Sequence, residues 1–135
     1  MCSSLIFMTT PTASTVLTGG VVPLTTIVRR KGCAIENGTN SVILNRPGYY
    51  KVTATVTFTA PAAGNVTLQL QKNGVAVPGI TASGTVITAT TEVNTLVVNG
   101  IVRVFCNEGV ATLTLVDTGV GITTSNVSLT VDYID

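Results

Sequence analysis

Apolar and polar residues alternate along most of this chain, and the longest clean example is "PGYYKVTATVTF" at residues 47–58. Five apolar side chains share one side of such a strand: Tyr50, Val52, Ala54, Val56 and Phe58. A period of two over this length is typical of an antiparallel sheet that packs one face on a core and leaves the other wetted. Because no helical periodicity longer than one turn occurs, we predict an all-β protein.

The same alternation, together with turn residues, predicts eleven strands. Their expected ranges are Leu5–Thr9, Leu24–Val28, Ser41–Leu44, Tyr49–Thr59, Asn65–Lys72, Val75–Pro78, Gly84–Thr88, Val93–Val98, Ile101–Phe105, Ala111–Val116 and Val127–Tyr133. That number suits a two-sheet antiparallel sandwich. We expect one domain over residues 1–135, with N-terminal strands and loops over 1–40 and the core sandwich over 41–135.

Turn residues divide these strands at several points. Asn73-Gly74 lies between two apolar runs and predicts a two-residue type I′ hairpin, whose central positions both need positive φ. Asn99-Gly100 fits either a second hairpin or a bulge within one longer strand. Residues 81–95 form the most polar, small-residue stretch, so we predict a long exposed connection there. Its candidate partner contacts are Thr85, Thr88, Thr90 and Thr91.

The composition leaves the surface short of charge. Hydrophobic residues make up 45% of the chain, charged residues only 10%, and the mean hydropathy is +0.56. A membrane helix is not expected, because apolar runs such as "LVVNGIVRVF" are short and broken by Asn, Gly and Arg. Six aromatic residues are too few for the girdles of a membrane barrel. Oligomerisation therefore explains the missing polar surface better, since large apolar patches usually mark contacts.

Charge and residue types argue against nucleic-acid binding, catalysis and a dedicated metal site. The net charge is +1, and the only basic cluster is "RRK" at 29–31, which is expected to be solvated. The chain has no histidine and its six acids are scattered, so we predict no enzyme, no catalytic residues and no cofactor. The oxygen-rich stretches 36–40 and 117–119 are expected to be plain turns rather than calcium loops.

The three cysteines, Cys2, Cys33 and Cys106, have no paired spacing. We therefore predict neither a zinc site nor a disulfide framework, and expect Cys33 and Cys106 to be buried small apolar residues. The odd count fits synthesis in a reducing cytoplasm. The opening "MCSSLIFMTT" lacks a basic start and a long apolar run, so it reads as a first strand rather than a signal peptide.

Two adjoining segments carry a family resemblance. "PGYYKVTATVTF" followed by "GNVTLQLQKNGVAVPG" resembles the opening of the core of the complement-q/tumour necrosis factor jelly rolls, with a Pro-Gly-x-Tyr turn, a long strand and a Lys-Asn-Gly hairpin. The matching residues are Pro47, Gly48, Tyr50, Phe58, Leu68, Lys72, Asn73 and Gly74. The match is good over residues 41–80 and holds only in outline toward the C-terminus.

The resemblance implies a ten-strand jelly roll that packs as a homotrimer, with Tyr50 and Tyr133 as candidate axis residues or ordinary core residues. The chain lacks the collagen stalk, signal peptide, paired cysteines and calcium acids of the animal members. It is similar to compact virion proteins of bacteriophages, which implies a head decoration or fibre knob located in the virion and bound to other virion proteins. A bacterial surface or spore-coat adhesin is the alternative. A host surface glycan is a further possible ligand for either, although few aromatic residues are available for it.

Overall fold

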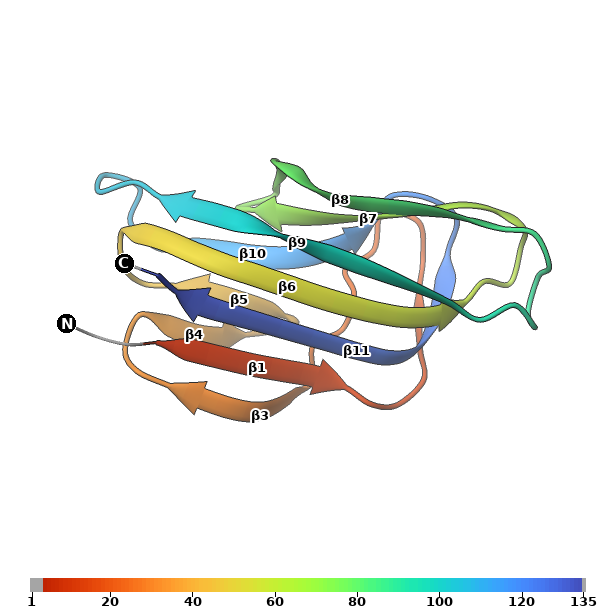
Figure 1. Cartoon of the computed structure of the whole chain (residues 1–135), viewed down its shortest axis with the longest axis horizontal. Coiled ribbons are helices and arrows are strands. Elements are labelled where there is room, and N and C mark those ends of the chain that lie inside the picture. The colour runs from red at the N-terminus through yellow and green to blue at the C-terminus, as the bar shows by residue number, and fades with distance from the viewer. Residues whose placement is uncertain (1–3, 135) are drawn as a thin grey trace.

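The computed structural model describes residues 4–134 and contains eleven strands and no helix in that range (Figure 1). The strands are β1 Leu5–Thr10, β2 Ser14–Val16, β3 Thr26–Lys31, β4 Ile35–Gly38, β5 Ser41–Leu44, β6 Gly48–Thr59, β7 Gly64–Lys72, β8 Val75–Val86, β9 Asn94–Val104, β10 Ala111–Asp117 and β11 Ile122–Tyr133. The prediction of an all-β antiparallel sandwich is confirmed. Within the described residues, no helix is long and apolar enough to cross a membrane.

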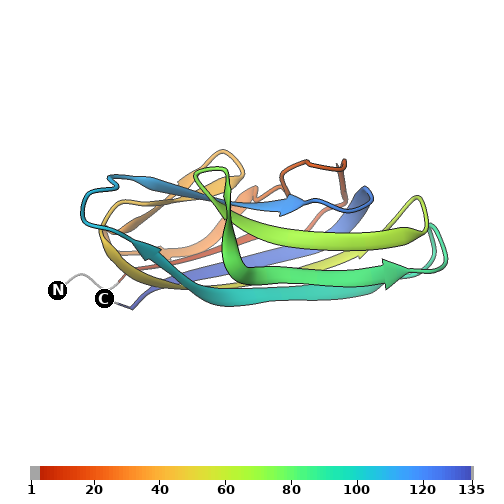
Figure 2. The same cartoon turned by 90° about the horizontal axis from the view of Figure 1, so that it is seen from above.

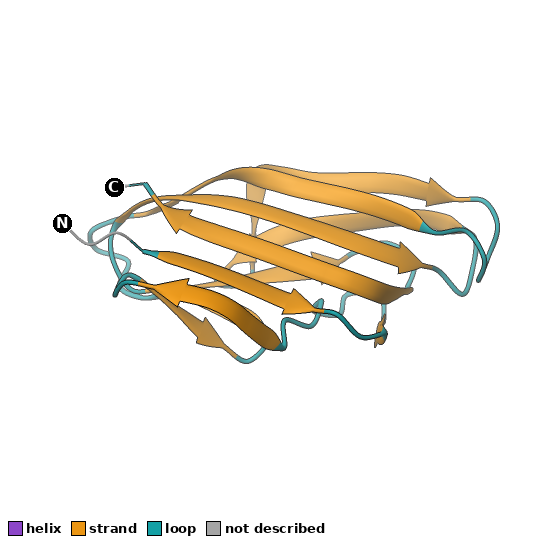
Figure 3. Ribbon diagram, turned by 60° about the horizontal axis from the view of Figure 1, so that its bottom comes forward, coloured by secondary structure: helices purple, strands orange, loops and turns teal. Residues whose placement is uncertain are grey.

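The strands form two antiparallel sheets that face each other. One sheet has the order β3-β1-β11-β6-β9, with the short β2 added to β11, and the other has the order β4-β5-β10-β7-β8. Figure 2 shows β8 and β9 running beside each other along one side of the sandwich, where the edges of the two sheets meet. The loops lie at the two ends of the strands (Figure 3). The N-terminal strand β1 lies inside the first sheet, between β3 and β11.

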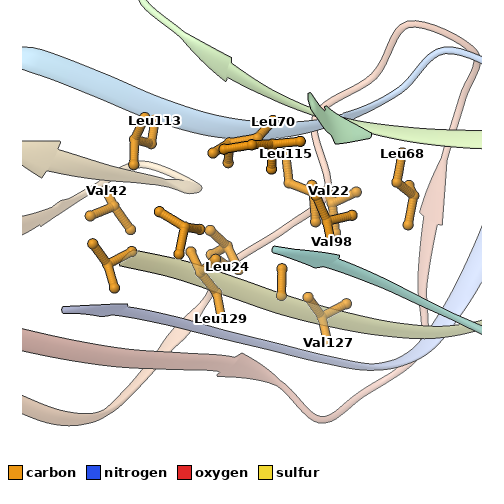
Figure 4. Packing of buried hydrophobic residues seen from close by; sticks show 14 of the residues in the cluster. Val22, Leu24, Val42, Leu68, Leu70, Val98, Leu113, Leu115, Val127 and Leu129 are labelled. Atoms are coloured by element: carbon orange, nitrogen blue, oxygen red, sulfur yellow. The ribbon is translucent and has the colours of Figure 1, made fainter. Parts of the chain in front are cut away.

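The core lies between the sheets and is made of the inward side chains that the alternating pattern predicts. On β6 these are Tyr50, Val52, Ala54, Val56 and Phe58, all at most 1% exposed. Figure 4 shows leucine and valine side chains from both sheets meeting in this layer, among them Leu68, Leu113 and Leu129. Most of these aliphatic side chains are fully buried, which gives the sandwich its hydrophobic stabilisation.

Several strand boundaries differ from the prediction. The two strands expected at 75–78 and 84–88 are one strand, β8, which carries a register shift opposite Gln69–Gln71 and a positive φ of 83° at Gly79. The two expected at 93–98 and 101–105 are also one strand, β9. Residues 99–100 therefore form neither a hairpin nor a bulge, because both pair in register with β6. A Cβ at Gly100 would lie 2.6 Å from Ile80 Cγ1, so close packing accounts for this glycine.

The N-terminal third also differs from the prediction. The third strand covers Thr26–Lys31 instead of Leu24–Val28, because Leu24 turns into the core. Two short strands, β2 and β4, were not predicted, and the chain has eleven strands where the resemblance implied ten. Strands of three or four residues contain too few alternations to stand out from loops.

The β7–β8 hairpin turns at Asn73 and Gly74, whose φ angles are 53° and 82°. Both central residues thus have the positive φ that a type I′ turn needs, and Lys72 pairs with Val75 on either side. The Asn73 backbone N–H donates to Thr112 O at 2.8 Å, and the Thr112 N–H donates to Asn73 Oδ1 at 2.9 Å. Asn73 therefore ties the hairpin to the neighbouring strand β10.

The cysteines depart from the prediction. Cys33 is disulfide-bonded, although the spacing of the cysteines suggested no disulfide. Cys2 lies outside the described residues. Cys33 and Cys106 are both exposed rather than buried, because each lies in a turn beyond the end of a strand. Spacing along the chain does not reveal a disulfide, because the bond depends on the distance between Cα atoms in the fold.

Asp117, the last residue of β10, carries a buried carboxylate that is only partly satisfied. Its side chain is 0% exposed, its Oδ1 accepts a hydrogen bond from Gly119 N at 3.0 Å, and its Oδ2 has no partner among the described residues. Burial raises the pKa of Asp117, and hydrogen bonds from the Gly119 and Thr67 backbones oppose this only in part. The ionised group therefore destabilises the folded chain at neutral pH.

Replacing Asp117 by asparagine is expected to increase the free energy of unfolding by about 1–2 kcal/mol at pH 7, because it removes a buried, poorly paired charge. Because the folded pKa is raised, the stabilisation from the protonated carboxyl is complete below the unfolded pKa and is lost as pH rises through the folded pKa. The advantage of Asp117→Asn should therefore grow from pH 4 to pH 7 in thermal melts. A variant less stable than the wild type at pH 7 would contradict this.

Candidate interaction surface

An apolar stripe runs along the outward face of β9. Its members are exposed by 46–64% and recur every four residues: Val93, Val97, Ile101 and Phe105, here called the β9 stripe. The inward side chains Val98, Val102 and Val104 are buried, so β9 is apolar on both faces. Because β9 is also the last strand of its sheet, it presents an unpaired backbone edge beside these side chains. A long apolar edge of this kind promotes association unless another surface covers it.

The face of the sheet next to the β9 stripe is polar but nearly uncharged. Thr53, Thr55 and Thr57 point outward from β6, and Ser128 and Thr130 lie beside them on β11. Thr57 and Thr95 share a hydrogen bond of 3.2 Å across β6 and β9. The outward residues of the long strand β6 are thus mainly hydroxyl-bearing, and its apolar residues serve the core. Exposed aliphatic side chains thus lie on β9 and not on β6.

At one end of the β9 stripe, an arginine side chain contacts two aromatic rings. The Arg103 guanidinium carbon lies 4.3 Å from the Phe105 ring centroid and 5.4 Å from that of Tyr49, which is paired with Arg103 across β6 and β9. We call these three residues the Arg103 clamp. Cation–π contacts with these two rings hold the guanidinium in place. Neither of the two ion pairs among the described residues involves Arg103, so its guanidinium has no carboxylate partner there.

Lys72 supports the clamp from β7. Its Nζ lies 2.8 Å from Glu108 Oε2, donates to Arg103 O at 2.9 Å, and sits 5.7 Å from the Phe105 ring centroid. Hydrogen bonds from Lys72 and from the Phe105 backbone N–H lower the pKa of Glu108. The β9–β10 turn is thereby fastened to the end of β7, which fixes the position of Phe105.

A small apolar cavity of about 140 Å³ opens beside Arg103. Five aliphatic residues and two cations line it: Val75, Ala76, Val77, Pro78 and Val102, with Lys72 and Arg103. An apolar cavity of about 150 Å³ holds a molecule the size of benzene, so this space can take an aliphatic side chain. The arrangement suits a group that combines a carboxylate with a neighbouring aliphatic chain.

The two tyrosines proposed for a trimer axis lie together at the start of β6. Tyr50 is 0% exposed and its hydroxyl donates to Arg46 O at 2.6 Å, whereas Tyr133 is half-buried and donates to Pro47 O at 3.0 Å. Their ring centroids are 5.0 Å apart, and burial raises the pKa of Tyr50. Tyr50 therefore takes the core role and presents no surface to a neighbour. Only Tyr133 keeps exposed area.

The long connection expected over 81–95 is shorter in the structure. Thr85 belongs to β8, where its hydroxyl donates to Asn65 Oδ1 at 3.0 Å, and the loop itself covers residues 87–93. Thr88, Thr90 and Thr91 are exposed there, and Thr90 has a φ of 66°, which is strained for a β-branched residue. Glu92 stabilises the loop by accepting hydrogen bonds from the backbones of residues 87 and 88 and from Asn94, and these bonds lower its pKa.

Of the two stretches considered for calcium, 36–40 comprises the end of β4 and a turn, and 117–119 leads out of the end of β10. In 36–40 the Asn40 Oδ1 accepts a hydrogen bond from Leu24 N at 3.2 Å, and in 117–119 the Asp117 carboxylate accepts one from Gly119 N. Within residues 4–134, no three His, Cys, Asp or Glu side chains gather as metal ligands would. The features that the described surface presents are an apolar stripe, a cationic clamp and a small aliphatic cavity.

The β9 stripe and the Arg103 clamp were both missed in the sequence, although the stripe left a signal. The run "LVVNGIVRVF" is apolar at nearly every position, which is the pattern of a strand covered on both faces. The Arg103 clamp left no signal in the sequence, because Tyr49 meets Arg103 only through the register of β6 with β9. Tyr49 and Phe105 are thus exposed aromatic residues.

Comparison with known proteins identifies the fold. The family model described as "PEGA domain" matches residues 31–74, about a third of the chain, and no curated protein sequence matches significantly. The globular domain of zebrafish complement 1qA protein superposes with a TM-score of 0.70 at 9% identity, covering 98% of both chains. Murine APRIL gives 0.70 at 12% identity, covering 98% of this chain and 99% of that one.

A phage protein shares the same architecture. The vertex protein P5 of phage PRD1 superposes with a TM-score of 0.61 at 13% identity, covering 100% of this chain and 99% of that chain. At these identities the likeness concerns the fold. The chain therefore has a TNF-like jelly-roll fold, as its segments at 47–58 and 64–79 suggested.

Proposed function

We propose that this chain is a non-enzymatic structural protein of a bacteriophage virion, a homotrimeric head decoration or fibre knob with an adhesive role. It would be made in the cytoplasm of the bacterial host and work in the virion. The single observation that carries the proposal is the β9 stripe, an exposed apolar edge that runs the length of β9. The chain that carries it has few charged residues. Such a surface calls for a protein partner rather than a small-molecule substrate.

Burial of the β9 stripe between copies supports the oligomeric part of the proposal. Removing a few hundred Å² of apolar surface from water contributes several kcal/mol per subunit at about 25 cal/mol per Å², before the entropy of association is subtracted. A closed ring also covers the unpaired edge of β9 without creating a new one. Three subunits, rather than two, follow from the family resemblance and not from this arithmetic.

The virion assignment is supported by the fold shared with a phage vertex protein and by a surface built for contacts rather than for chemistry. The polar loop at 87–93, held by Glu92 and carrying exposed Ile87 and Val93, offers a second contact region at the end of the molecule away from the Arg103 clamp (Figure 1). It is the candidate surface for other virion proteins or for a host surface glycan. Thr88, Thr90 and Thr91 remain its candidate contact residues.

Electron microscopy of purified phage particles, labelled with a gold-conjugated antibody against this protein, tests the virion assignment. We expect label at defined positions on the head or at fibre tips. Label on bacterial cells or spores, with particles unlabelled, would replace the proposal by the alternative, a surface or spore-coat adhesin of the same fold. Particles of an unrelated phage, treated with the same antibody, provide the background.

A further inference from the structure

The Arg103 clamp suits a carboxylate that the described residues of the same chain do not supply. Two rings fix the guanidinium, and the described ion pairs, Arg30–Glu36 and Lys72–Glu108, leave Arg103 unpaired. A guanidinium binds a carboxylate through two parallel hydrogen bonds when its plane is held in this way. The adjoining aliphatic cavity can accommodate an apolar side chain close to that carboxylate.

The end of β11 carries a pair of side chains with this chemistry. Asp132 is exposed and Ile134 is 50% exposed, and the Ile134 backbone N–H donates to Tyr49 O at 2.9 Å, which continues the pairing with β6. Residues two apart in an extended chain project to the same side, about 6.5 Å from each other. Asp132 and Ile134 thus present a carboxylate and an aliphatic group together on the outward face of the sheet.

Asp132 is also the only carboxylate that fits by position among the described residues. Glu36 lies on the opposite sheet, Glu92 caps the loop at the far end, and Asp117 is buried. Glu108 is already occupied by Lys72. Within one chain β6 separates β11 from β9 by two strand spacings, about 9.6 Å, and no ion pair joins Asp132 to Arg103.

Arg103 and Asp132 lie at nearly the same position along the direction of the strands. Arg103 is opposite Tyr49, and Asp132 is opposite Lys51, only two residues further along β6. In a ring of identical subunits whose strands run along the axis, each residue meets residues of the same height on the next copy. Arg103 on the edge of one copy therefore meets the neighbour's sheet at the level of Asp132.

We infer that, in the oligomer, Asp132 and Ile134 of one copy dock into the Arg103 clamp and the adjoining cavity of the next copy. This inference rests on the proposed self-assembly. It names the contact that fixes how each subunit is oriented against the next one in the ring. The occupant of the clamp is a second copy of this chain, recognised by its carboxylate and its aliphatic side chain. In the proposed three-fold ring the contact is heterologous, because each copy offers its Arg103 clamp to one neighbour and its Asp132 and Ile134 to the other.

Charge reversal provides the test, with oligomer dissociation constants measured by sedimentation velocity on the full chain. Arg103→Asp and Asp132→Arg should each weaken assembly on the order of a hundredfold, because each places like charges against each other across the contact. The double variant R103D/D132R restores opposite charges and should assemble at least tenfold more tightly than either single variant. Ile134→Ala should weaken assembly about tenfold through the loss of buried methylene groups.

Arg29→Asp and Glu36→Arg are the matched controls, because both residues are exposed and lie away from β9 and β11. They should leave assembly unchanged, and circular dichroism should show that all the variants are folded. Single variants that assemble like the wild type would overturn the inference while leaving the proposed oligomer intact. A double variant no tighter than the singles would also overturn it. A wild-type chain that is monomeric at micromolar concentration would instead defeat the proposed self-assembly itself.

Discussion

A chain carrying both Val97→Asp and Ile101→Asp is expected to be a folded monomer. The two residues lie at the centre of the β9 stripe and are 50% and 51% exposed in the single chain, so the substitutions leave the core untouched. In an assembled ring they would bury two unpaired carboxylates per subunit, each of which carries a large desolvation penalty. Assembly should therefore weaken by at least a hundredfold. Light scattering at micromolar concentration should then give the mass of one subunit.

Leu17→Asp is the control for this variant, because Leu17 is 74% exposed and lies in a turn outside the β9 stripe. It places the same charge on an exposed apolar position and should retain the mass of the wild type. If V97D/I101D kept the wild-type mass, the β9 stripe would not be the subunit contact, and the main support for the proposed function would be lost.

Gly119→Ala is expected to destabilise the fold by more than about 3 kcal/mol, or to prevent folding altogether. A Cβ at this position would overlap the Asn65 carbonyl oxygen and lie 2.8 Å from Thr67 N, both backbone atoms of β7. These atoms cannot move aside, because β7 is paired on one side with β8 and on the other with β10. The turn after β10 therefore packs directly on the backbone of β7, and only glycine permits this distance.

Gly74→Ala separates this steric effect from the general effect of replacing a glycine. Gly74 has a φ of 82° and nothing within 4 Å of the added Cβ, so alanine should lose only about 1–2 kcal/mol there. Both changes in the free energy of unfolding can be measured by urea unfolding in the V97D/I101D background. In that background the protein is expected to unfold as a single chain. A Gly119→Ala variant within 1 kcal/mol of its parent would contradict the close packing of this turn.

The features that were predicted from the sequence depend on neighbours along the chain. The alternation of β6 is complete within twelve residues, and the hairpin at Asn73-Gly74 is set by two residues that tolerate positive φ. The errors arose where a glycine resembled a turn but lies inside a strand. Gly79 allows a register shift within β8, and Gly100 makes room for Ile80 from the opposite sheet.

The candidate surface could be predicted only in part. The low charge of the chain pointed to association, and the apolar run of β9 contained the stripe. The Arg103 clamp joins Tyr49 with residues more than fifty positions away, and its geometry depends on the register between β6 and β9. Tyr50 was a candidate for the axis by resemblance and for the core by strand alternation, and the structure has it in the core.

The mass of the wild-type chain in solution tests the central claim most directly. Light scattering coupled to size-exclusion chromatography, at micromolar concentration and moderate salt, should give a mass close to three times 13.9 kDa. A mass near two subunits would retain self-assembly but contradict the three-fold arrangement. A mass near 13.9 kDa would contradict the account, since the β9 stripe would then remain exposed to water in the working protein.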